Sequence, residues 1–533
     1  MTHHVRAVVV TTLLVAAPGP APGDEAGVAR CGSAKVAAMA RACGDLLAAE
    51  ARFLRTADGA ARDRRIDTAR ARVVAAWTAV EAEAGDARCA ADTATAGAAV
   101  DRLAAAVAVA AARAATPPEC GRTLVRLWRR SCRTVVATEG AALRAPGDAA
   151  SERATTLARL RRRMDRRWPA PGCASGIGAD EAVRIVLRLA SGAAADATTR
   201  GMRTVAAEAG RAIGAAIEPD EVAADPAYAP ALAHDSGSVT AENAMKWGPI
   251  HPEPDRWVFG PADAVVALAE AQGQRVRGHT LVWGAMQLPA YVQNAATADA
   301  LRGYMRDHIA GLVGRYAGRI AQWDVVNEPL PGILDPPTSD GLDDNVFRRL
   351  LGPGYVAEAL QHARAADPAA RLYLNENGIE APGPRQDRFY ALVQELLAAG
   401  APLDGVGFQA HVGLIPPGQY PDRAVIEASL RRFADLGLEV ELTELDVTLV
   451  FRPGDLPARL AQQGDDYRAM VEACMAVAAC RGITTWGLSD RYTWLRSFFG
   501  FDDWPLPFGD AWERKPAYFG IRAALLLHLL ETA

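Results

Sequence analysis

The sequence has few lysines and no long apolar run in its body. Only three of the 58 basic residues are lysines, namely Lys35, Lys246 and Lys515. No apolar run after residue 30 reaches the roughly 18 residues that a membrane helix needs, so we expect no membrane span. An apolar content of 50% and a charged content of 23% exclude a wholly disordered chain.

Motifs of several enzyme classes are also missing. The sequence has no HExxH pair, Gly-x-Ser-x-Gly elbow, phosphate-binding loop or dinucleotide fingerprint. It has no CxxC pair, and no histidine lies between His4 and His234, so zinc explains the N-terminal cysteines poorly. We therefore expect no metal and no cofactor. The net charge of −5 gives no indication of nucleic-acid binding.

The first 23 residues have the pattern of a secretory signal peptide, although a disordered N-terminus is the alternative. Arg6 precedes an apolar run over residues 7–17, which a Pro/Gly-rich stretch follows. The chain has eight cysteines, an even number, which favours disulfides in an oxidising compartment. We expect a secreted, periplasmic or extracellular protein.

Residues 31–175 are basic and predict a helical domain. Residues 31–173 hold 25 Lys and Arg against 15 Asp and Glu, a net of +10. Six cysteines form two sets with a first spacing of twelve, and the Ala/Arg-rich stretches between them favour helices. We expect two disulfide-stapled hairpins, over 31–89 and 120–173, with a connecting helix over 95–115. The cysteine pairing cannot be deduced, and Trp77, Trp128 and Trp168 are expected in the core.

The run RLRRRMDRRW, residues 159–168, is the most basic stretch of the chain. One interpretation is a patch that binds an anionic polymer or a cell surface. The other is a solvated helix face in an Arg-rich protein, and the composition favours this second interpretation.

From about residue 200 to 530, short β-like runs alternate with amphipathic stretches. Eight such strand–helix units match the requirement of a (β/α)8 barrel, so the predicted fold is an α/β TIM barrel preceded by an all-α domain. The runs cover residues 212–217, 237–243, 275–283, 320–328, 371–377, 405–411, 439–446 and 483–490.

Seven of the eight runs end in polar or aromatic side chains. A barrel places its active site at the carboxyl ends of its strands, so these groups are expected at one mouth. Indoles that stack on sugar rings, with carboxylates and amides that bind hydroxyls, suit a carbohydrate site. The groups are Glu242, Asn243, His279, Trp283, Asn327, Glu328, Asn375, Gln409, His411, Glu444, Asp446, Trp486 and Asp490.

Two of these glutamates predict the chemistry. Glu328 and Glu444 end the fourth and seventh runs, and paired carboxylates cleave glycosidic bonds as acid and nucleophile. Residues two apart on a strand share a face, so Gln409 lies beside His411 and Glu444 beside Asp446. We expect His411, oriented by Asp446, to keep Glu444 charged while Glu328 holds a proton.

Residues 200–530 resemble glycoside hydrolase family 10, the retaining endo-β-1,4-xylanases. The motifs that carry the resemblance are SVTAENAMKW, VRGHTLVW, WDVVNEP, GFQAHV, LTELDV, ITTWGLSDRYTWL and KPAY. The resemblance implies that Glu328 is the acid/base and Glu444 the nucleophile, with carboxyls about 5–5.5 Å apart. It also implies a Cys474–Cys480 disulfide, and a 2-hydroxyl contact from Asn327. Further sugar contacts are implied for Glu242, Asn243, Lys246, His279, Trp283, Gln409, Trp486 and Trp494.

The sequence departs from the family pattern at Gly284, Met286, Tyr291 and Asn377. These changes leave the glutamate pair intact and affect contacts to individual sugars. The resemblance implies hydrolysis of β-1,4-xylan, a plant polysaccharide. The alternatives are a relative that acts on another β-1,4-glycan or an aryl glycoside, and a non-catalytic carbohydrate-binding barrel.

Overall fold

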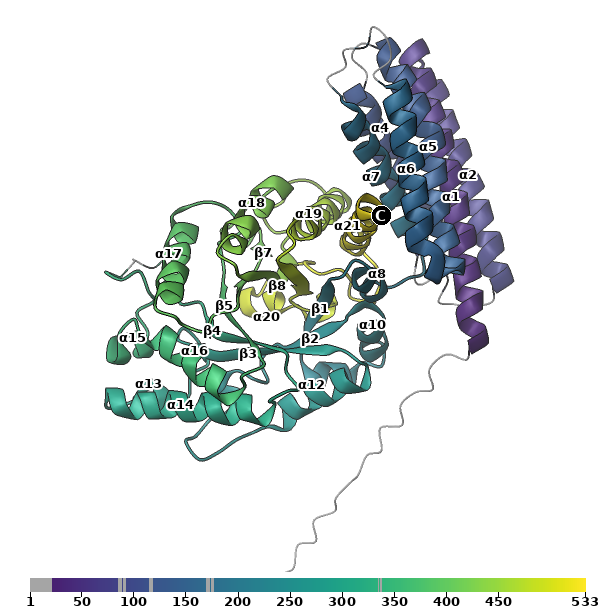
Figure 1. The fold of residues 1–533 in the computed structure, drawn as a ribbon. Coiled ribbons are helices and arrows are strands. Elements are labelled where there is room, and N and C mark those ends of the chain that lie inside the picture. The colour runs from purple at the N-terminus through teal and green to yellow at the C-terminus, as the bar shows by residue number, and fades with distance from the viewer. Residues whose placement is uncertain are drawn as a thin grey trace, which may run out of the picture.

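A computed structural model describes residues 22–84, 89, 93–114, 118–168, 173, 177–333, 335 and 338–533. Over these ranges, a bundle of long helices lies beside a barrel of parallel strands wrapped in helices (Figure 1). This architecture confirms the predicted fold class. The expected signal peptide, 1–23, lies almost wholly outside the described residues. Of the helices that are described, none is long and apolar enough to cross a membrane.

The helical bundle is cross-linked by three disulfides. Cys31–Cys89 and Cys120–Cys173 each join cysteines of one sequence repeat, whereas Cys43–Cys132 joins the two repeats through α1 and α5. The buried Trp77, Trp128 and Trp168 lie in the core. The bundle helices are α1 (Pro22–Thr56), α2 (Gly59–Ala84), α4 (Ala96–Ala114), α5 (Pro118–Arg144), α6 (Ala149–Arg167) and α7 (Ala179–Ala197), with a short 3-10 turn at Pro146–Asp148.

Lys35 is fully buried between α1 and α2. Its ammonium donates hydrogen bonds to Glu81, to the carbonyl of Cys89 at 2.9 Å and to Thr93 Oγ1 at 2.7 Å, and lies 4.9 Å from the ring centre of Trp77. A tetrahedral ammonium can donate in three directions from one point, which a planar guanidinium cannot. This geometry explains a lysine in a region that otherwise uses arginine.

Eight parallel strands close the barrel, since β9 pairs with β1 and β6 pairs with β8. The two-residue strand β7 adds to the edge of β8. The expected run 483–490 is shifted, because the last strand ends before Trp486. The strands are β1 (Ala212–Ile217), β2 (Ser238–Ala241), β3 (Arg275–Trp283), β4 (Gln322–Asn327), β5 (Arg371–Glu376), β6 (Gly405–Phe408), β7 (His411–Val412), β8 (Glu439–Val447) and β9 (Cys480–Thr485).

Helices cover the outside of the barrel, and several begin at standard signals. Asp422 and Asp455 accept from backbone N–H groups at the helix starts, and Pro384 and Pro516 occupy the first helical turn. The helices are α8 (Met202–Glu208), α9 (Pro219–Ala224), α10 (Tyr228–Asp235), α11 (Trp247–Ile250), α12 (Gly260–Ala271), α13 (Ala290–Gln293), α14 (Ala298–Arg315), α15 (Val346–Leu351), α16 (Tyr355–Ala366), α17 (Pro384–Ala398), α18 (Arg423–Ala434), α19 (Leu456–Ala476), α20 (Trp494–Phe499) and α21 (Pro516–Thr532), with a 3-10 turn at Asp490–Tyr492.

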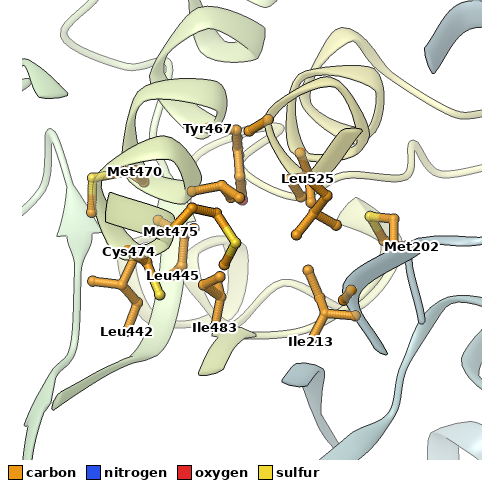
Figure 2. Packing of buried hydrophobic residues seen from close by; sticks show 14 of the residues in the cluster. Met202, Ile213, Leu442, Leu445, Tyr467, Met470, Cys474, Met475, Ile483 and Leu525 are labelled. Carbon is orange, nitrogen blue, oxygen red and sulfur yellow. The ribbon is translucent and has the colours of Figure 1, made fainter. Parts of the chain in front are cut away.

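The barrel core continues under α19 and α21. Figure 2 shows Tyr467 and Met475 of α19, Leu525 of α21 and Ile483 of β9 packed together in this layer. The Cys474–Cys480 disulfide joins the end of α19 to the start of β9. It fixes the short connection that leads into the last strand.

Helix α7 joins the bundle to the barrel and packs against both. Arg188 of α7 pairs with Glu472 of α19, and the buried guanidinium of Arg522 on α21 donates to the carbonyls of Ala195 and Arg200. Figure 1 shows α7 and α21 side by side between the two parts. The buried apolar residues of both parts form one continuous cluster. We therefore expect the bundle to hold a fixed position on the barrel.

The disulfides give a test of how the bundle is stabilised. Cys43–Cys132 spans 89 residues of sequence and Cys474–Cys480 spans 6. A cross-link restricts the unfolded chain more when its loop is longer, so Cys43→Ser with Cys132→Ser should cost about 2–4 kcal/mol of unfolding free energy. Calorimetry should find a smaller loss for Cys474→Ser with Cys480→Ser. An equal or larger loss for the short loop would contradict this.

Candidate functional site

The polar side chains at the ends of β3, β4 and β5 lie next to one another. Trp283 is the register partner of Asn327, and Asn327 is the partner of Asn375. The three strands are parallel, so their carboxyl ends open on one mouth. The strand register therefore gathers the groups that the sequence pattern placed there.

Glu328 follows β4 and turns its carboxylate toward this mouth. Its φ of 52° lies in the left-handed region, which costs a residue with a side chain on the order of 1–3 kcal/mol. The N–H of Glu328 donates to the Asn375 carbonyl at 2.8 Å. The carboxylate accepts from Trp283 Nε1 and from Gln409 Nε2, both at 2.8 Å. These contacts orient both carboxylate oxygens.

Glu444 on β8 is 4% exposed and is held by an amide and an imidazole. Oε1 accepts from Asn375 Nδ2, and Oε2 lies 3.2 Å from His411 Nε2. Burial acts to raise the pKa of Glu444, but the hydrogen bond from His411 and the neighbouring imidazoles of His279 and His411 outweigh it. The net result is a lowered pKa.

His411 lies between two carboxylates. Its Nδ1 is 3.0 Å from Asp446 Oδ2, which also accepts from Trp494 Nε1 at 2.9 Å. Burial acts to lower the pKa of His411, but Asp446 and Glu444 raise it well above the usual value. An imidazolium donates from both ring nitrogens, which matches one carboxylate on each side.

Gln409 and His411 do not lie on one continuous strand, so the prediction that they share a face was wrong. Strand β6 ends at Phe408, and Ala410 has a φ of 63°. This left-handed residue breaks the strand and turns the two side chains to different partners. Gln409 contacts Glu328 and Asn327, whereas His411 contacts Glu444 and Asp446.

Asn375, which the sequence pattern placed at the mouth without a role, connects the two glutamates. Its amide donates to Asn327 Oδ1 at 2.8 Å and to Glu444, and its own oxygen accepts from Thr443 Oγ1 at 2.6 Å. Asn375 is fully buried, which fixes this orientation. Its place at the end of the fifth run indicated a mouth residue, and only these contacts reveal its role.

A cavity of 570 Å³ opens beside the glutamates. Lys246 donates to Asn243 Oδ1 at 2.9 Å, and its ammonium lies 5.0 Å from the ring centre of Trp283 and 5.9 Å from that of Trp486. Burial and the charge of Glu218 raise the pKa of Glu242 to about 8. Among the lining residues are Glu218, Glu221, Glu242, Asn243, Lys246, Trp283, Met286, Trp486 and Trp494.

Trp486 lines this cavity, and His279 lies against it. His279 Nδ1 is 3.0 Å from Asp324 Oδ2, and its ring meets that of Trp486 edge to face at 5.1 Å. Asp324 also pairs with the buried Arg277, whose other side donates to Glu441 at 2.7 Å. Within the described ranges, no group of three or more His, Cys, Asp or Glu side chains is arranged to hold a metal ion.

The four departures from the family pattern fall in different surroundings. Met286 is 43% exposed and lines the cavity, whereas Gly284 lies so close to Asn345 that a side chain would clash. The Tyr291 hydroxyl accepts from Trp247 Nε1 at 2.8 Å, away from the cavity. Asn377 uses its backbone, which bonds to Glu376 and Arg385. Met286 is therefore the change that alters the cavity wall.

Comparisons with known proteins agree with this geometry. The model of glycosyl hydrolase family 10 matches residues 201–524. Endo-1,4-beta-xylanase A of Phanerodontia chrysosporium is 38% identical, and the match covers 61% of this chain and 78% of that protein. The endo-1,4-beta-xylanase of Agaricus bisporus is 37% identical, and the match covers 60% of this chain and 93% of that protein.

Solved structures give the same result for the barrel. Native xylanase 10B from Thermotoga maritima is 32% identical with a TM-score of 0.57, over 62% of this chain and 100% of its own. Xylanase 10B from Thermotoga petrophila, solved in complex with xylobiose, is also 32% identical with a TM-score of 0.57. That match covers 61% of this chain and 97% of the xylanase chain. The family match spans more than half of the chain and carries the ordered strand-end motifs, so this chain belongs to glycosyl hydrolase family 10.

Proposed function

We propose that this protein is an endo-acting xylanase that cleaves internal β-1,4-xylosidic bonds of xylan with retention of configuration. The observation that carries the proposal is the pair of glutamates at one mouth, held by one amide network but with different partners. Glu444 is paired with His411 and has a lowered pKa, whereas the donors to the Glu328 carboxylate among the described residues are the neutral N–H groups of Trp283 and Gln409. Such different surroundings assign different roles to two carboxyl groups.

In the first step, Glu444 attacks the anomeric carbon while Glu328 gives its proton to the departing glycosidic oxygen. This breaks the C–O bond and leaves the sugar as an ester of Glu444. In the second step, Glu328 takes a proton from water, the water oxygen bonds to the anomeric carbon, and Glu444 leaves. Two inversions at one carbon give net retention.

Asn327 is assigned to the 2-hydroxyl of the sugar being cleaved. Its oxygen accepts from Asn375 and Gln409, so the amide is oriented with its NH2 group available as a donor. Lys246, Asn243 and Glu242 bind sugars on the non-reducing side, and Trp486 and Trp494 cover them. His411 and Asp446 act as positioning residues for Glu444, since they act on the reaction only through its charge.

We also propose that the protein acts outside the cell. Its polymeric substrate cannot cross a membrane, the disulfides need an oxidising compartment, and the N-terminal sequence has the pattern of a signal peptide. Detection of the processed chain in the culture medium tests this.

Substrate preference is tested by product analysis on purified polysaccharides. We expect xylan to be cut internally to short oligosaccharides at a rate above that for cellulose oligomers or mixed-linkage glucan. Met286 lines the cavity with a flexible apolar side chain, which supports a relative of different glycan preference as the second candidate. Faster hydrolysis of a glucan than of xylan would replace the first assignment by this one.

The roles of the glutamates are distinguished by azide. With an aryl β-xylobioside, Glu444→Ala should lose about 10⁴-fold or more of kcat, because no nucleophile remains. Glu328→Ala should lose about 10²–10⁴-fold of kcat, because the ester forms but is hydrolysed slowly without a general base. Azide should then give a β-xylobiosyl azide from Glu328→Ala and an α-xylobiosyl azide from Glu444→Ala.

A control for both variants is Glu395→Ala on the exposed face of α17, which should leave the rate unchanged. Circular dichroism and the melting temperature establish that each variant is folded. Wild-type turnover in folded Glu444→Ala, or an α-azide from Glu328→Ala, would refute the assigned roles.

The pH profile tests the positioning role of His411. Hydrolysis stops when Glu444 takes up a proton, so the acid limb of kcat/KM follows the pKa of Glu444. His411→Asn removes a cation and leaves burial to raise that pKa, so the limb should move to higher pH by about 1–2 units. His362→Asn, outside the site, should leave the limb in place. An unchanged limb in His411→Asn would show that His411 does not control Glu444.

A further inference from the structure

The helical bundle has a groove between α5 and α6 that the proposed hydrolysis does not use. Its volume is 990 Å³, and in the described part of the chain five arginines line it together with Thr, Ser and Ala side chains and one carboxylate, Glu152. The arginines are Arg126, Arg129, Arg130, Arg133 and Arg159. Four of them come from α5, so the groove differs from the basic run 159–168, which contributes Arg159 alone.

The five groove arginines are all exposed, and none forms an ion pair with a carboxylate among the residues that the structure describes. Arginines on the barrel surface behave differently: Arg315 pairs with Asp263, and Arg319 pairs with Glu270. The groove therefore collects positive charge without the local compensation that is common elsewhere in this chain.

A neighbouring arginine, Arg163, shows that positive charges are crowded near the groove. Arg163 lies one turn after Arg159 on α6, and burial together with the charges of Arg130 and Arg167 lowers its pKa. A second cavity of 560 Å³, between α1 and α2, shares Arg129 with the first and adds four more arginines. The basic surface is thus longer than one cavity and suits an extended ligand.

We propose that this groove binds a linear polysaccharide that carries carboxylate groups, such as a uronic-acid polymer. A guanidinium donates two parallel hydrogen bonds to one carboxylate, and repeated uronates would meet repeated arginines. Among the residues that the structure describes, no aromatic side chain lines either cavity, which argues against stacking of nucleobases. The apolar lining from these residues consists only of alanines, which argues against insertion into a lipid bilayer.

The choice of a polysaccharide rests on the proposed function, because α7 fixes the bundle on a barrel that would work within polysaccharide networks. Binding of a uronic-acid polymer would then keep the enzyme in a polymer matrix that also contains its neutral substrate. The groove and the catalytic mouth have no lining residue in common. Binding of the polymer and hydrolysis of xylan can therefore fail independently in an experiment.

The test uses the full-length protein and a four-site groove variant, Arg126→Gln, Arg130→Gln, Arg133→Gln and Arg159→Gln. Titration calorimetry with polygalacturonate at low salt should show binding that the variant weakens at least about tenfold and that added salt weakens in both. A control with the same charge change replaces four exposed barrel arginines, Arg256, Arg306, Arg319 and Arg349, by Gln. The control should bind like the wild type, and all three proteins should hydrolyse an aryl β-xylobioside equally.

A third variant, with Lys at the four groove positions, keeps the charge but removes the planar forks, and should bind with intermediate strength. The proposal is overturned if the wild type shows no binding to polygalacturonate at low salt, or if the groove and barrel variants lose equal affinity. It is also overturned if duplex DNA or anionic phosphatidylglycerol vesicles bind the groove more tightly than polygalacturonate does. Loss of xylan hydrolysis with intact polygalacturonate binding would instead refute the proposed function alone.

Discussion

The mouth of the barrel depends on keeping carboxylates charged where little water reaches them. A buried carboxylate is stable only when cations or N–H donors replace its lost hydration. Glu444 meets this requirement through His411 and Asn375, and Asp324 meets it through Arg277 and His279. Every partner comes from a different strand from the carboxylate that it serves, so the strand register is also an electrostatic requirement. A slip of one residue would unpair several charges at once.

The three lysines show how specific these buried sites are. Lys515 donates to Asp490 at 2.7 Å and to the carbonyls of Trp504 and Leu506, which holds the segment after β9 that carries Trp494. Lys35 likewise serves three acceptors inside the bundle. Lys246 has one described acceptor and two indole faces, so its ammonium keeps donor capacity for a ligand. A chain that otherwise uses arginine has kept lysine where a compact cation must donate in several directions.

The sequence pattern predicted the barrel and most of the strand-end groups because both depend on local periodicity and chain direction. It did not predict what depends on three-dimensional contacts. The strand break occurs at Ala410, a residue in the left-handed conformation, where the sequence has no glycine to indicate a break. The Cys43–Cys132 bond depends on the contact of α1 with α5, which the sequence pattern does not show. Helix α7 lies outside both expected domains, 31–175 and 200–530, although it packs against the bundle and the barrel. The sequence pattern placed Asn375 at a strand end. That it connects the two glutamates follows only from its hydrogen bonds to Glu444 and Asn327 and from the bond of the Glu328 N–H to its carbonyl.

The two parts of the chain deal with excess charge in opposite ways. In the cavity beside the glutamates, burial raises the pKa of Glu221 to about 7 and that of Glu242 to about 8, so part of the negative charge is removed by proton uptake near neutral pH. Arginine cannot lose its charge by releasing a proton in this way, because its guanidinium stays charged at any pH that the fold tolerates. The groove arginines of the bundle must therefore be compensated from outside, by small ions or by a polyanion. A polymer whose charges are already fixed along one chain has less entropy to lose in doing so than the equivalent number of free ions, which favours a multivalent ligand wherever one is present.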